Sequence, residues 1–439
     1  MWMLKKIAKI LQWPCDVDAP VGRFAIDSRC VKKGCVFFAL EGEKVDGHAF
    51  LEEVAKKGGL AAVVSKKYVG SDFSLCLLRV DDVKGALHKL AKHAFSKRRE
   101  TVVAITGSMG KTTTKEFVAT LLEEKYKVAK TPGNHNTQLT LPLTLLNLEE
   151  ECDVLVLEMG MGEHGDLTRL IELAPPDIAV VTQIAPAGLL DFKGGLEAVA
   201  KAKGEIFSHP KTRLGIVSAQ AASFASILYG GPSKWIYGLR QDFSDVRDGD
   251  FVMEKDGRIN DSPPITLQFE GEHLKENFLA AVAVARSLGL SWHEIGAGAK
   301  KCKPYPMRFE KIERGGITFI NDCYNANPHS TFAALKHLPK PAAGGRTLAV
   351  LGEMKDLGKA SKHYHSQVGS FAAEKVDHLF CVGADAKPLA EQFSHSGKRA
   401  EYFSSVREVR EKLQRETKPG DVVLIKGSNN LKLWEILQE

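Results

Sequence analysis

The amino-acid sequence predicts an α/β protein with three domains in series. Its 439 residues are too many for one hydrophobic core, and at about 150 residues per domain they suggest three domains. Short apolar runs alternate with helical patterns, which is typical of parallel sheets covered by helices. We expect a small N-terminal α/β domain (1–81), a central parallel-sheet domain with a P-loop-type turn (82–309) and a C-terminal Rossmann-like domain (310–439).

The first domain is predicted from four apolar runs, FAIDS, CVFFAL, AAVVS and LCLLRV, around the helical pattern HAFLEEVAKKGG. The start, MWMLKKIAKILQWP, has basic residues between its apolar ones. We therefore interpret it as a short amphipathic helix rather than a signal peptide. Asp81 and Asp82 can begin the next helix, DDVKGALHKLAKHAFSKRR, which bridges to the second domain.

The second and third domains are predicted from two further alternations of strand and helix. In the second, the strand runs are TVVAIT, DVLVLEMG, DIAVVTQI and RLGIVSA, and a long helix is HLKENFLAAVAVARSLGL. In the third, the strand runs are GITFIND, RTLAVLGEM, HLFCVGAD and VVLIKGS, with the helix PHSTFAALKHL after the first. Each alternation indicates βαβ units in a mostly parallel sheet.

Composition excludes several classes of function. The chain is 44% hydrophobic and 26% charged, and no apolar stretch is long enough for membrane insertion. A net charge of +6 is small for this length, and KRR at 97–99 is the one basic block, so we expect no nucleic-acid partner. Eight cysteines without a C-x-x-C pair indicate reduced thiols and a cytoplasmic protein.

The segment VVAITGSMGKTTTKE predicts a phosphate-binding loop between a strand and a helix. Gly107 and Gly110 let the backbone approach phosphate oxygens, Lys111 can reach the β- and γ-phosphates, and the Thr112 hydroxyl can bind Mg²⁺. Ile105 stands where the usual pattern G-x-x-x-x-G-K-[ST] has its first glycine. The remaining loop residues are Ser108, Met109 and Thr113. The alternative is an ordinary strand–helix turn with a surface lysine.

The shortened loop T-G-x-x-G-K-T resembles the ATP loop of the Mur ligases and the folylpolyglutamate synthases. Four other segments resemble the Mur ligase that adds D-alanyl-D-alanine: AIDSRCVKKGCVFFALEGEKVDGHAF, TPGNHNTQLTLPLTLL, VLEMGMGEHGDL and NDCYNANPHS. The resemblance covers essentially the whole chain in the family's order. Its most specific element is Y-N-A-N-P, because the sister enzyme that forms the tripeptide has a D-Y-A-H-type segment there.

The resemblance implies an ATP-dependent amide ligase of peptidoglycan precursor synthesis in the cytoplasm. Its substrates would be UDP-MurNAc-tripeptide and D-Ala-D-Ala, joined through an acyl phosphate, and we expect a monomer. Such a reaction needs cations at the γ-phosphate, exclusion of water and a neutral amine held close. Two alternatives remain open: a sister ligase with another amino acid, and a nucleotide-binding relative that has lost turnover.

The resemblance also implies a metal and catalytic site for two Mg²⁺ ions. Glu158 at the end of DVLVLE matches a metal-binding glutamate, and Lys203 in EAVAKAKGEIF matches a lysine that carries a carbamate (N6-carboxylysine). From the residues alone, a solvent-facing glutamate and a solvated helix lysine are the alternatives. Lys201 and Lys203 cannot share one helical face, so at most one of them points to the metals.

The remaining candidate residues also follow from the resemblance. ATP contacts are implied for Asn277, Arg308, Asp322, Tyr324 and Asn325, with Asp322 also in the catalytic set. Substrate contacts are implied for Ser28, Arg29, Asp46, His48, Asn134, Asn136 and Thr137. The pattern of residues 46–48 is also typical of a turn and a helix cap.

The chain departs from the family pattern at three places. Gly188, with an offset of one residue possible, stands where a histidine beside the second metal is expected. Thr137 and Thr140 stand where the family has Asn and Gly, and Asn429 stands where Arg is common. None of these departures touches the phosphate loop. The sequence does not reveal the third residue of the tripeptide.

Overall fold

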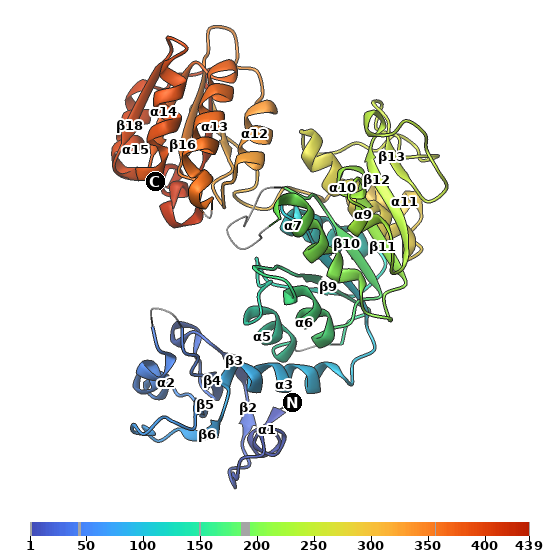
Figure 1. Ribbon diagram of the computed structural model, residues 1–439, viewed down its shortest axis with the longest axis vertical. Coiled ribbons are helices and arrows are strands. Elements are labelled where there is room, and N and C mark those ends of the chain that lie inside the picture. The colour runs from blue at the N-terminus through green and yellow to red at the C-terminus, as the bar shows by residue number, and fades with distance from the viewer. Residues whose placement is uncertain (1, 43–44, 149–150, 186–193, 356, 439) are drawn as a thin grey trace. The chain divides into compact units, whose positions relative to one another are not determined.

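The computed structural model describes residues 2–42, 45–148, 151–185, 194–355 and 357–438. The chain forms two compact units. The first holds residues 1–104, 126–179 and 205–213, and the second holds residues 105–125, 180–204 and 214–439. Strands and helices alternate through both units (Figure 1), which confirms the predicted α/β class.

The N-terminal part of the first unit is built on a four-stranded parallel sheet with the order β3-β4-β5-β6. Its strands are the four predicted apolar runs, and β4 and β5 are buried along their whole length. Helix α1 buries Leu4, Ile7, Ala8 and Leu11 at helical spacing, which confirms the amphipathic start. The elements are β1 (Trp2–Met3), α1 (Leu4–Leu11), β2 (Pro20–Val21), β3 (Arg23–Ala25), β4 (Cys35–Phe38), α2 (Leu51–Lys56), β5 (Ala61–Ser65), β6 (Cys76–Val80) and α3 (Val83–Phe95).

A seven-stranded sheet follows, with the order β13-β12-β11-β10-β7-β9-β8. The pairs β8–β9, β11–β12 and β12–β13 are parallel. Four strands were predicted, whereas β8, β12 and β13 are additional; β12 is only half-buried over most of its length and therefore lacks a clear apolar run. The strands are β7 (Thr101–Thr106), β8 (Val128–Lys130), β9 (Val154–Glu158), β10 (Ile178–Val181), β11 (Leu214–Ser218), β12 (Ser233–Leu239) and β13 (Phe251–Met253).

Two helices of this region begin at a side-chain cap. Ser218 caps α8, and Ser291 forms a capping box with Glu294 at the start of α11. The helices are α4 (Lys111–Leu122), α5 (Thr140–Leu146), α6 (Asp166–Leu173), α7 (Gly195–Gly204), α8 (Ala219–Ala222), α9 (Ala225–Leu228), α10 (Glu272–Ser287) and α11 (Trp292–Ala299). Among the described residues, no helix combines the length and apolar character needed to cross a membrane.

The C-terminal part of the second unit contains a six-stranded sheet with the order β14-β15-β19-β16-β17-β18. Only the β14–β15 pair is antiparallel among these neighbours. The chain moves one way across the sheet from β15 to β18 and then returns to β19. Right-handed crossovers therefore place α12, α13 and α14 on one face and α15 on the other. The elements are β14 (Glu310–Arg314), β15 (Ile317–Asn321), α12 (Pro328–Lys336), β16 (Thr347–Gly352), α13 (Ser361–Lys375), β17 (His378–Val382), α14 (Lys387–Ser394), β18 (Arg399–Phe403), α15 (Val406–Glu416) and β19 (Val422–Lys426).

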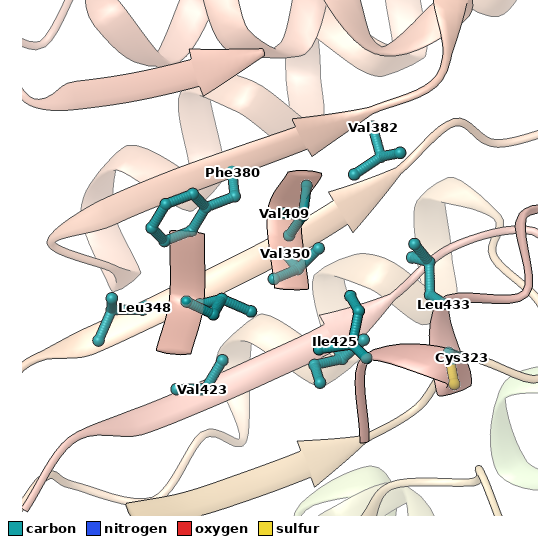
Figure 2. Close-up of a cluster of buried hydrophobic side chains, with 11 residues drawn as sticks. Cys323, Leu348, Val350, Phe380, Val382, Val409, Val423, Ile425 and Leu433 are labelled. Atoms are coloured by element: carbon teal, nitrogen blue, oxygen red, sulfur yellow. The ribbon is translucent and has the colours of Figure 1, made fainter. Parts of the chain in front are cut away.

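One core cluster of this sheet lies under α15. Leu348 and Val350 of β16 and Val423 and Ile425 of β19 are buried together with Val409 of α15 (Figure 2). Residues two apart in a strand point to the same face, which explains the spacing of these side chains. The packed core fixes the strand ends, and the functional side chains described below follow β15 and end β19.

Candidate functional site

The phosphate loop lies between β7 and α4, and two glycines determine its shape. Gly107 has φ +147° and Gly110 has φ +79°, which side-chain-bearing residues rarely adopt. A Cβ atom at Gly107 would lie 1.8 Å from Thr182 Oγ1, and one at Gly110 would lie 2.3 Å from Asn277 Oδ1. Ile105 is fully buried inside β7. The first glycine of the usual pattern is therefore not needed, because the turn begins after that position.

The loop is held in place by the segment that follows β10. The Ser108 N–H donates to the Gln183 carbonyl at 2.7 Å, and the Ser108 hydroxyl donates to the Ala185 carbonyl at 3.1 Å. The Thr182 hydroxyl donates to the Thr106 carbonyl at 3.1 Å. The Lys111 ammonium donates to the Gly107 carbonyl at 2.7 Å. These hydrogen bonds order the loop backbone directly before α4. The N–H groups at the N-terminus of a helix form a favourable place for an anion.

Within the second unit, seven of the predicted ATP residues line one cavity. The other five are not among its lining residues: Gly107, Ser108, Lys111, Tyr324 and Asn325. Asn277, on α10, accepts a hydrogen bond from the Thr114 hydroxyl at 3.3 Å and so joins α10 to α4. The lining residues that the sequence predicted are Met109, Gly110, Thr112, Thr113, Asn277, Arg308 and Asp322. Those that it missed include Gln183, His273, Phe309 and Lys426. The cavity therefore unites residues that are up to about three hundred positions apart, which a strand–helix turn with a surface lysine does not explain.

An ion pair fixes the far wall of this cavity. Lys426, at the end of β19, is 2% exposed and donates to Asp322 Oδ2 at 2.7 Å. It also donates to the Asn325 carbonyl at 3.0 Å, while the Asn429 amide donates to the Tyr324 carbonyl at 3.0 Å. The pair therefore holds the loop after β15 in one conformation. A lysine that ends the apolar run VVLIKGS was a signal that could have identified Lys426.

Two polar atoms of the cavity have no hydrogen-bond partner among the described residues. They are Nε of Arg308 and Nδ1 of His273, and both are buried. The Arg308 guanidinium carbon lies 4.0 Å from the centre of the Tyr324 ring. Burial lowers the pKa of His273 to about 4, so its imidazole is neutral at neutral pH. Leaving buried polar atoms unsatisfied is costly, which indicates that a polar ligand completes them.

A second titratable side chain of α10 lies behind the phosphate loop. Glu276 accepts a hydrogen bond from the Gln183 amide at 2.5 Å, and Gln183 is the residue whose carbonyl holds Ser108. Burial, together with the charge of Asp242, raises the pKa of Glu276 to about 7. This pair could not be predicted from a local pattern, because its partners are 93 residues apart.

Lys203 lies near the C-terminal end of α7 and is 5% exposed, whereas Lys201 is exposed. The two lysines therefore point in different directions, as their spacing predicts. Burial, and to a smaller degree the positive charge of Lys111, lowers the pKa of Lys203 well below its ordinary value. Because Lys203 is buried, the interpretation as a solvated helix lysine is wrong for it.

In the first unit, Glu158 ends β9 and is 1% exposed. Its Oε1 accepts from the Asn136 amide at 2.6 Å, and the Asn136 carbonyl accepts from the Gly160 N–H at 2.7 Å. Thr137 is exposed, and its hydroxyl lies 3.0 Å from that of Thr140. The burial excludes the alternative of a solvent-facing glutamate. Asn134 is exposed and its carbonyl accepts from the Asn136 N–H.

The predicted uridine residues form two local groups. The Ser28 hydroxyl donates to Glu53 at 2.9 Å, and the exposed Arg29 pairs with Asp27 at 2.6 Å. His48 is buried; its Nε2 accepts from the Ser65 N–H at 3.0 Å. Its Nδ1 therefore carries the proton and lies 2.6 Å from Asp46 Oδ1. Asp46 and His48 stabilise the turn Gly47–Phe50, in agreement with the reading of this pattern as a helix cap.

A second cavity, of about 560 Å³, lies within the first unit. It is lined by residues around Asp27 and by the segment that includes His135 and Thr140. Asn147 joins the two sides: its carbonyl oxygen accepts from the Phe24 N–H at 2.9 Å, and its amide donates to the Phe24 carbonyl at 3.0 Å. Gly188, the position of the expected metal-side histidine, lies outside the described residues.

Comparison with known families identifies all three predicted domains. The Mur ligase family catalytic domain matches residues 22–95, the Mur ligase middle domain matches 105–285 and the Mur ligase glutamate ligase domain matches 307–429. Their order agrees with three domains in series. The boundaries at 81/82 and 309/310 stay predictions.

Individual relatives match almost the whole chain. The UDP-N-acetylmuramoyl-tripeptide–D-alanyl-D-alanine ligase of Bacillus subtilis is 32% identical over 94% of this chain and 92% of its own length. The solved structure of MurF from Acinetobacter baumannii superposes with a TM-score of 0.81 at 26% identity, covering 99% of this chain and 98% of its own. MurF ligase from Thermotoga maritima in complex with ADP has a TM-score of 0.77 and 30% identity, over 95% and 96% of the two chains. The chain therefore belongs to the Mur ligase family, in the group of the UDP-N-acetylmuramoyl-tripeptide–D-alanyl-D-alanine ligases.

Proposed function

We propose that the chain catalyses the ATP-dependent addition of D-alanyl-D-alanine to UDP-MurNAc-tripeptide in peptidoglycan precursor synthesis, releasing ADP and phosphate. The observation that carries this proposal is the cavity in which the phosphate loop faces Arg308, Asp322 and Lys426. It occurs in a chain related along its length to ligases named for this activity. We further propose that the protein acts in the cytoplasm as a monomer.

The cavity supports ATP as the energy source. Gly107 and Gly110 give the loop a backbone conformation that side-chain-bearing residues rarely adopt, and Lys111 sits on the loop where it can turn toward the terminal phosphates. Arg308 and His273 bring buried polar atoms that a nucleotide can satisfy. Arg308 suits an anion because its guanidinium donates several hydrogen bonds in one plane. Asn277 and the Asp322–Asn325 loop would complete the nucleotide contacts.

Lys203 is proposed to react with CO₂. The neutral amine attacks the carbon of CO₂, and loss of one proton leaves an N-carboxylate anion. The burial of Lys203 favours the neutral amine, whereas the nearby positive charge of Lys111 favours both the neutral amine and the later anion. The exposed Lys201 lacks both influences.

We propose Thr112, Glu158 and carboxylated Lys203 as Mg²⁺ ligands, because each offers the oxygen donor that Mg²⁺ prefers. An unmodified amine at Lys203 would not fit, so the fit depends on the carboxylate. When bound, Mg²⁺, as two ions, would supply positive charge against the phosphates of ATP. Thr112 is buried at the start of α4, and Glu158 is oriented by Asn136. Both oxygen donors are therefore held by their own neighbours.

The chemistry then proceeds in two steps. The terminal carboxylate of the tripeptide attacks the γ-phosphorus, ADP leaves, and an acyl phosphate forms. The neutral amine of D-Ala-D-Ala attacks the acyl carbon, phosphate leaves with the bonding electrons, and the nitrogen loses one proton. Water must be excluded while the acyl phosphate exists. We propose that Asn134, Asn136 and Thr137 contact the tripeptide.

For the nucleotide of the first substrate, we propose Ser28 and Arg29 as contacts. Arg29 is exposed and pairs with Asp27. A bound diphosphate could replace Asp27 as the partner of the Arg29 guanidinium. Asp46 and His48 already bind each other, so we propose that they support this region by holding the turn Gly47–Phe50.

One assay tests the proposed function. Purified protein, ATP, Mg²⁺ and UDP-MurNAc-tripeptide are mixed with D-Ala-D-Ala or with single amino acids, and phosphate release and product mass are measured. We expect turnover only with D-Ala-D-Ala, and Lys111→Ala should abolish it while circular dichroism stays unchanged. Equal turnover with L-lysine, diaminopimelate or glutamate would indicate a sister ligase. ATP binding without phosphate release for any amine would indicate a relative that has lost turnover.

A further inference from the structure

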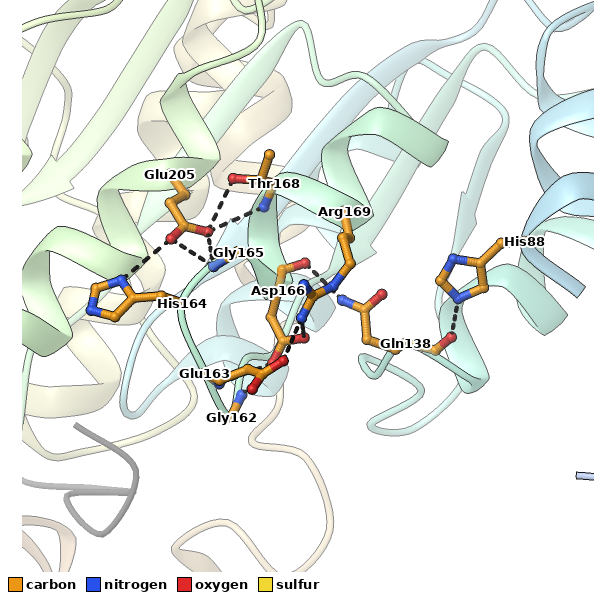
Figure 3. A network of polar contacts seen from close by, with 10 residues as sticks. All are labelled: His88, Gln138, Gly162, Glu163, His164, Gly165, Asp166, Thr168, Arg169 and Glu205. Atoms are coloured by element: carbon orange, nitrogen blue, oxygen red, sulfur yellow. Dashed lines mark hydrogen bonds and ion pairs between the residues drawn. The ribbon is translucent and has the colours of Figure 1, made fainter. Parts of the chain in front are cut away.

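Helix α6 has no capping side chain of its own. Its N-cap residue is Gly165, with φ +84°, so the N–H groups of its first turn need acceptors from elsewhere. Glu205, forty residues later, supplies them (Figure 3). Its two carboxylate oxygens accept from the Gly165 N–H at 2.9 and 3.0 Å. Oε2 also accepts from the Thr168 hydroxyl at 3.1 Å and the Thr168 N–H at 3.3 Å.

The negative charge of Glu205 suits this position. A carboxylate at a helix N-terminus is stabilised by the partial positive charge of the unpaired N–H groups, and charge-assisted hydrogen bonds are the stronger kind. His164 Nδ1 lies 3.5 Å from Glu205 Oε1 on the side away from Thr168 (Figure 3). The carboxylate is only 19% exposed. The contact is therefore a partly buried clasp with several donors and not a surface ion pair.

Glu205 is close to Lys203 in the chain, and this position indicates what the clasp does. Glu205 directly follows α7 and comes two residues after Lys203. Two residues span at most about 7 Å of extended chain, so fixing Glu205 limits where the backbone of Lys203 can lie. The other side of the clasp is the loop 159–165, which directly follows Glu158. Glu205 thus binds the loop that follows one proposed acidic ligand, Glu158, and stands two positions after the other, Lys203.

The loop 159–165 is held by further hydrogen bonds and ion pairs, so the clasp binds an ordered segment. Asp166 Oδ2 accepts from the N–H groups of Gly162 at 2.8 Å and Glu163 at 3.0 Å. Arg169 pairs with Asp166 at 2.8 Å and with Glu163 at 2.7 Å. Figure 3 shows these contacts on the side of α6 that faces away from Glu205. Because these contacts order the loop, the Glu205 carboxylate binds a fixed segment and can position its own neighbours in the chain.

We propose that Glu205 is a positioning residue for Lys203: it clasps the N-terminus of α6 and so fixes the end of α7 at the place where the Lys203 amine is carboxylated. The inference rests on the proposed function, because it assigns the purpose of the clasp through the carboxylation of Lys203. Glu205 itself does not touch the substrate or the reacting atoms.

The test uses the full-length protein and three variants. Glu205→Ala removes the clasp; Glu205→Gln keeps one oxygen that can accept from Gly165 and Thr168 but lacks the charge. The matched control is Glu163→Gln, which lies in the same loop and is exposed; its side chain pairs with Arg169. Folding of each variant is checked by circular dichroism and thermal unfolding.

Two readouts do not depend on turnover. Carboxylation is measured by ¹³C NMR after incubation with ¹³C-bicarbonate, and accessibility of Lys203 is measured as its rate of acetylation by acetic anhydride, followed by peptide mass spectrometry. We expect Glu205→Ala to lose most of the carbamate signal and to acetylate at Lys203 at least tenfold faster. Glu205→Gln should be intermediate, and Glu163→Gln should match the wild type. The Mg²⁺ concentration for half-maximal activity should rise in the same order.

The outcomes separate the two proposals. If Glu205→Ala folds and keeps the wild-type acetylation rate, carbamate signal and Mg²⁺ requirement, the positioning role is overturned. Should Glu205→Ala fail to fold, a wild-type acetylation rate, carbamate signal and Mg²⁺ requirement in Glu205→Gln overturn it equally. A wild-type protein without any carbamate signal would instead contradict the carboxylation of Lys203, and with it the purpose assigned to the clasp. The ligase activity itself is judged by the amine-donor assay alone.

Discussion

Replacement of Glu276 by Gln should remove a large pH dependence of stability. Glu276 is mostly buried beside Gln183, and burial raises its pKa from 4.5 to about 7. The folded state therefore holds this proton more tightly than the unfolded state. Below pH 4.5 both states are protonated and the native contact contributes fully. Between pH 4.5 and 7 the carboxyl group ionises in the unfolded state but stays protonated in the folded state, so the free energy of unfolding falls. Above pH 7 the group is ionised in both states and the contribution of Glu276 to stability has been lost.

The size of the effect follows from the shift in pKa. One pKa unit corresponds to about 1.4 kcal/mol of unfolding free energy, so the whole shift corresponds to about 3 kcal/mol. About 2.5 kcal/mol of this free energy is lost between pH 5 and pH 8. Glutamine has nearly the same shape and does not titrate. Relative to Glu276→Gln, the wild type should therefore lose about 2.5 kcal/mol of unfolding free energy over this range.

The assay is urea unfolding of both proteins at pH 5, 6, 7 and 8. Glu272, one turn earlier on α10, provides the control, because Lys336 lowers its pKa to about 2. Its stabilising contribution is lost only as the pH falls from about 4.5 toward 2, so Glu272→Gln should give a constant offset from pH 5 to 8. A constant difference between the wild type and Glu276→Gln over the same range would refute the reasoning, because Glu276 would then not change its charge there.

Three further predictions concern the loop, the lysine and a pair of thiols. Gly107→Ala should weaken ADP binding at least a hundredfold by calorimetry, because its Cβ would lie 1.8 Å from a threonine hydroxyl; a wild-type Kd would contradict the loop assignment. Lys203→Ala should be almost inactive in phosphate release and partly rescued by short carboxylic acids, whereas Lys201→Ala should stay near wild type; the reverse order would exclude Lys203 from the site. A small-molecule disulfide should oxidise Cys15 and Cys76, whose sulfur atoms are 3.3 Å apart, lowering the mass by about 2 Da and raising stability by up to about 4 kcal/mol; unchanged mass would show that the thiols do not pair.

The sequence predicted the parts of the site that depend on short segments. The phosphate loop follows from the turn itself, because Gly107 and Gly110 are required by local backbone geometry. The contrast between Lys203 and Lys201 follows from helical spacing alone. The ends of β9 and β15 were identifiable because a charged residue ends each apolar run.

The rest depends on pairs of residues that are far apart in the chain. Lys426 meets Asp322 only because β19 inserts between β15 and β16, and no local pattern reveals that strand order. In the sequence, Glu205 is an ordinary charged residue after a helix. Its role becomes visible only in the structure, because α6 has no side-chain cap of its own. Strands such as β12 were missed for a related reason: a half-buried strand has too few apolar residues to form a clear run.

The electrostatic relation between Lys111 and Lys203 connects the phosphate loop with the proposed carboxylation. A buried ammonium at Lys203 would suffer both desolvation and repulsion from Lys111, which is why its pKa falls. Carboxylation reverses the sign of the charge, so the same neighbour attracts the product. Lys111 also donates to the Gly107 carbonyl and thereby stays close to the loop. In the proposed mechanism, the one cation Lys111 can thus serve both the phosphates of ATP and the carboxylate proposed at Lys203.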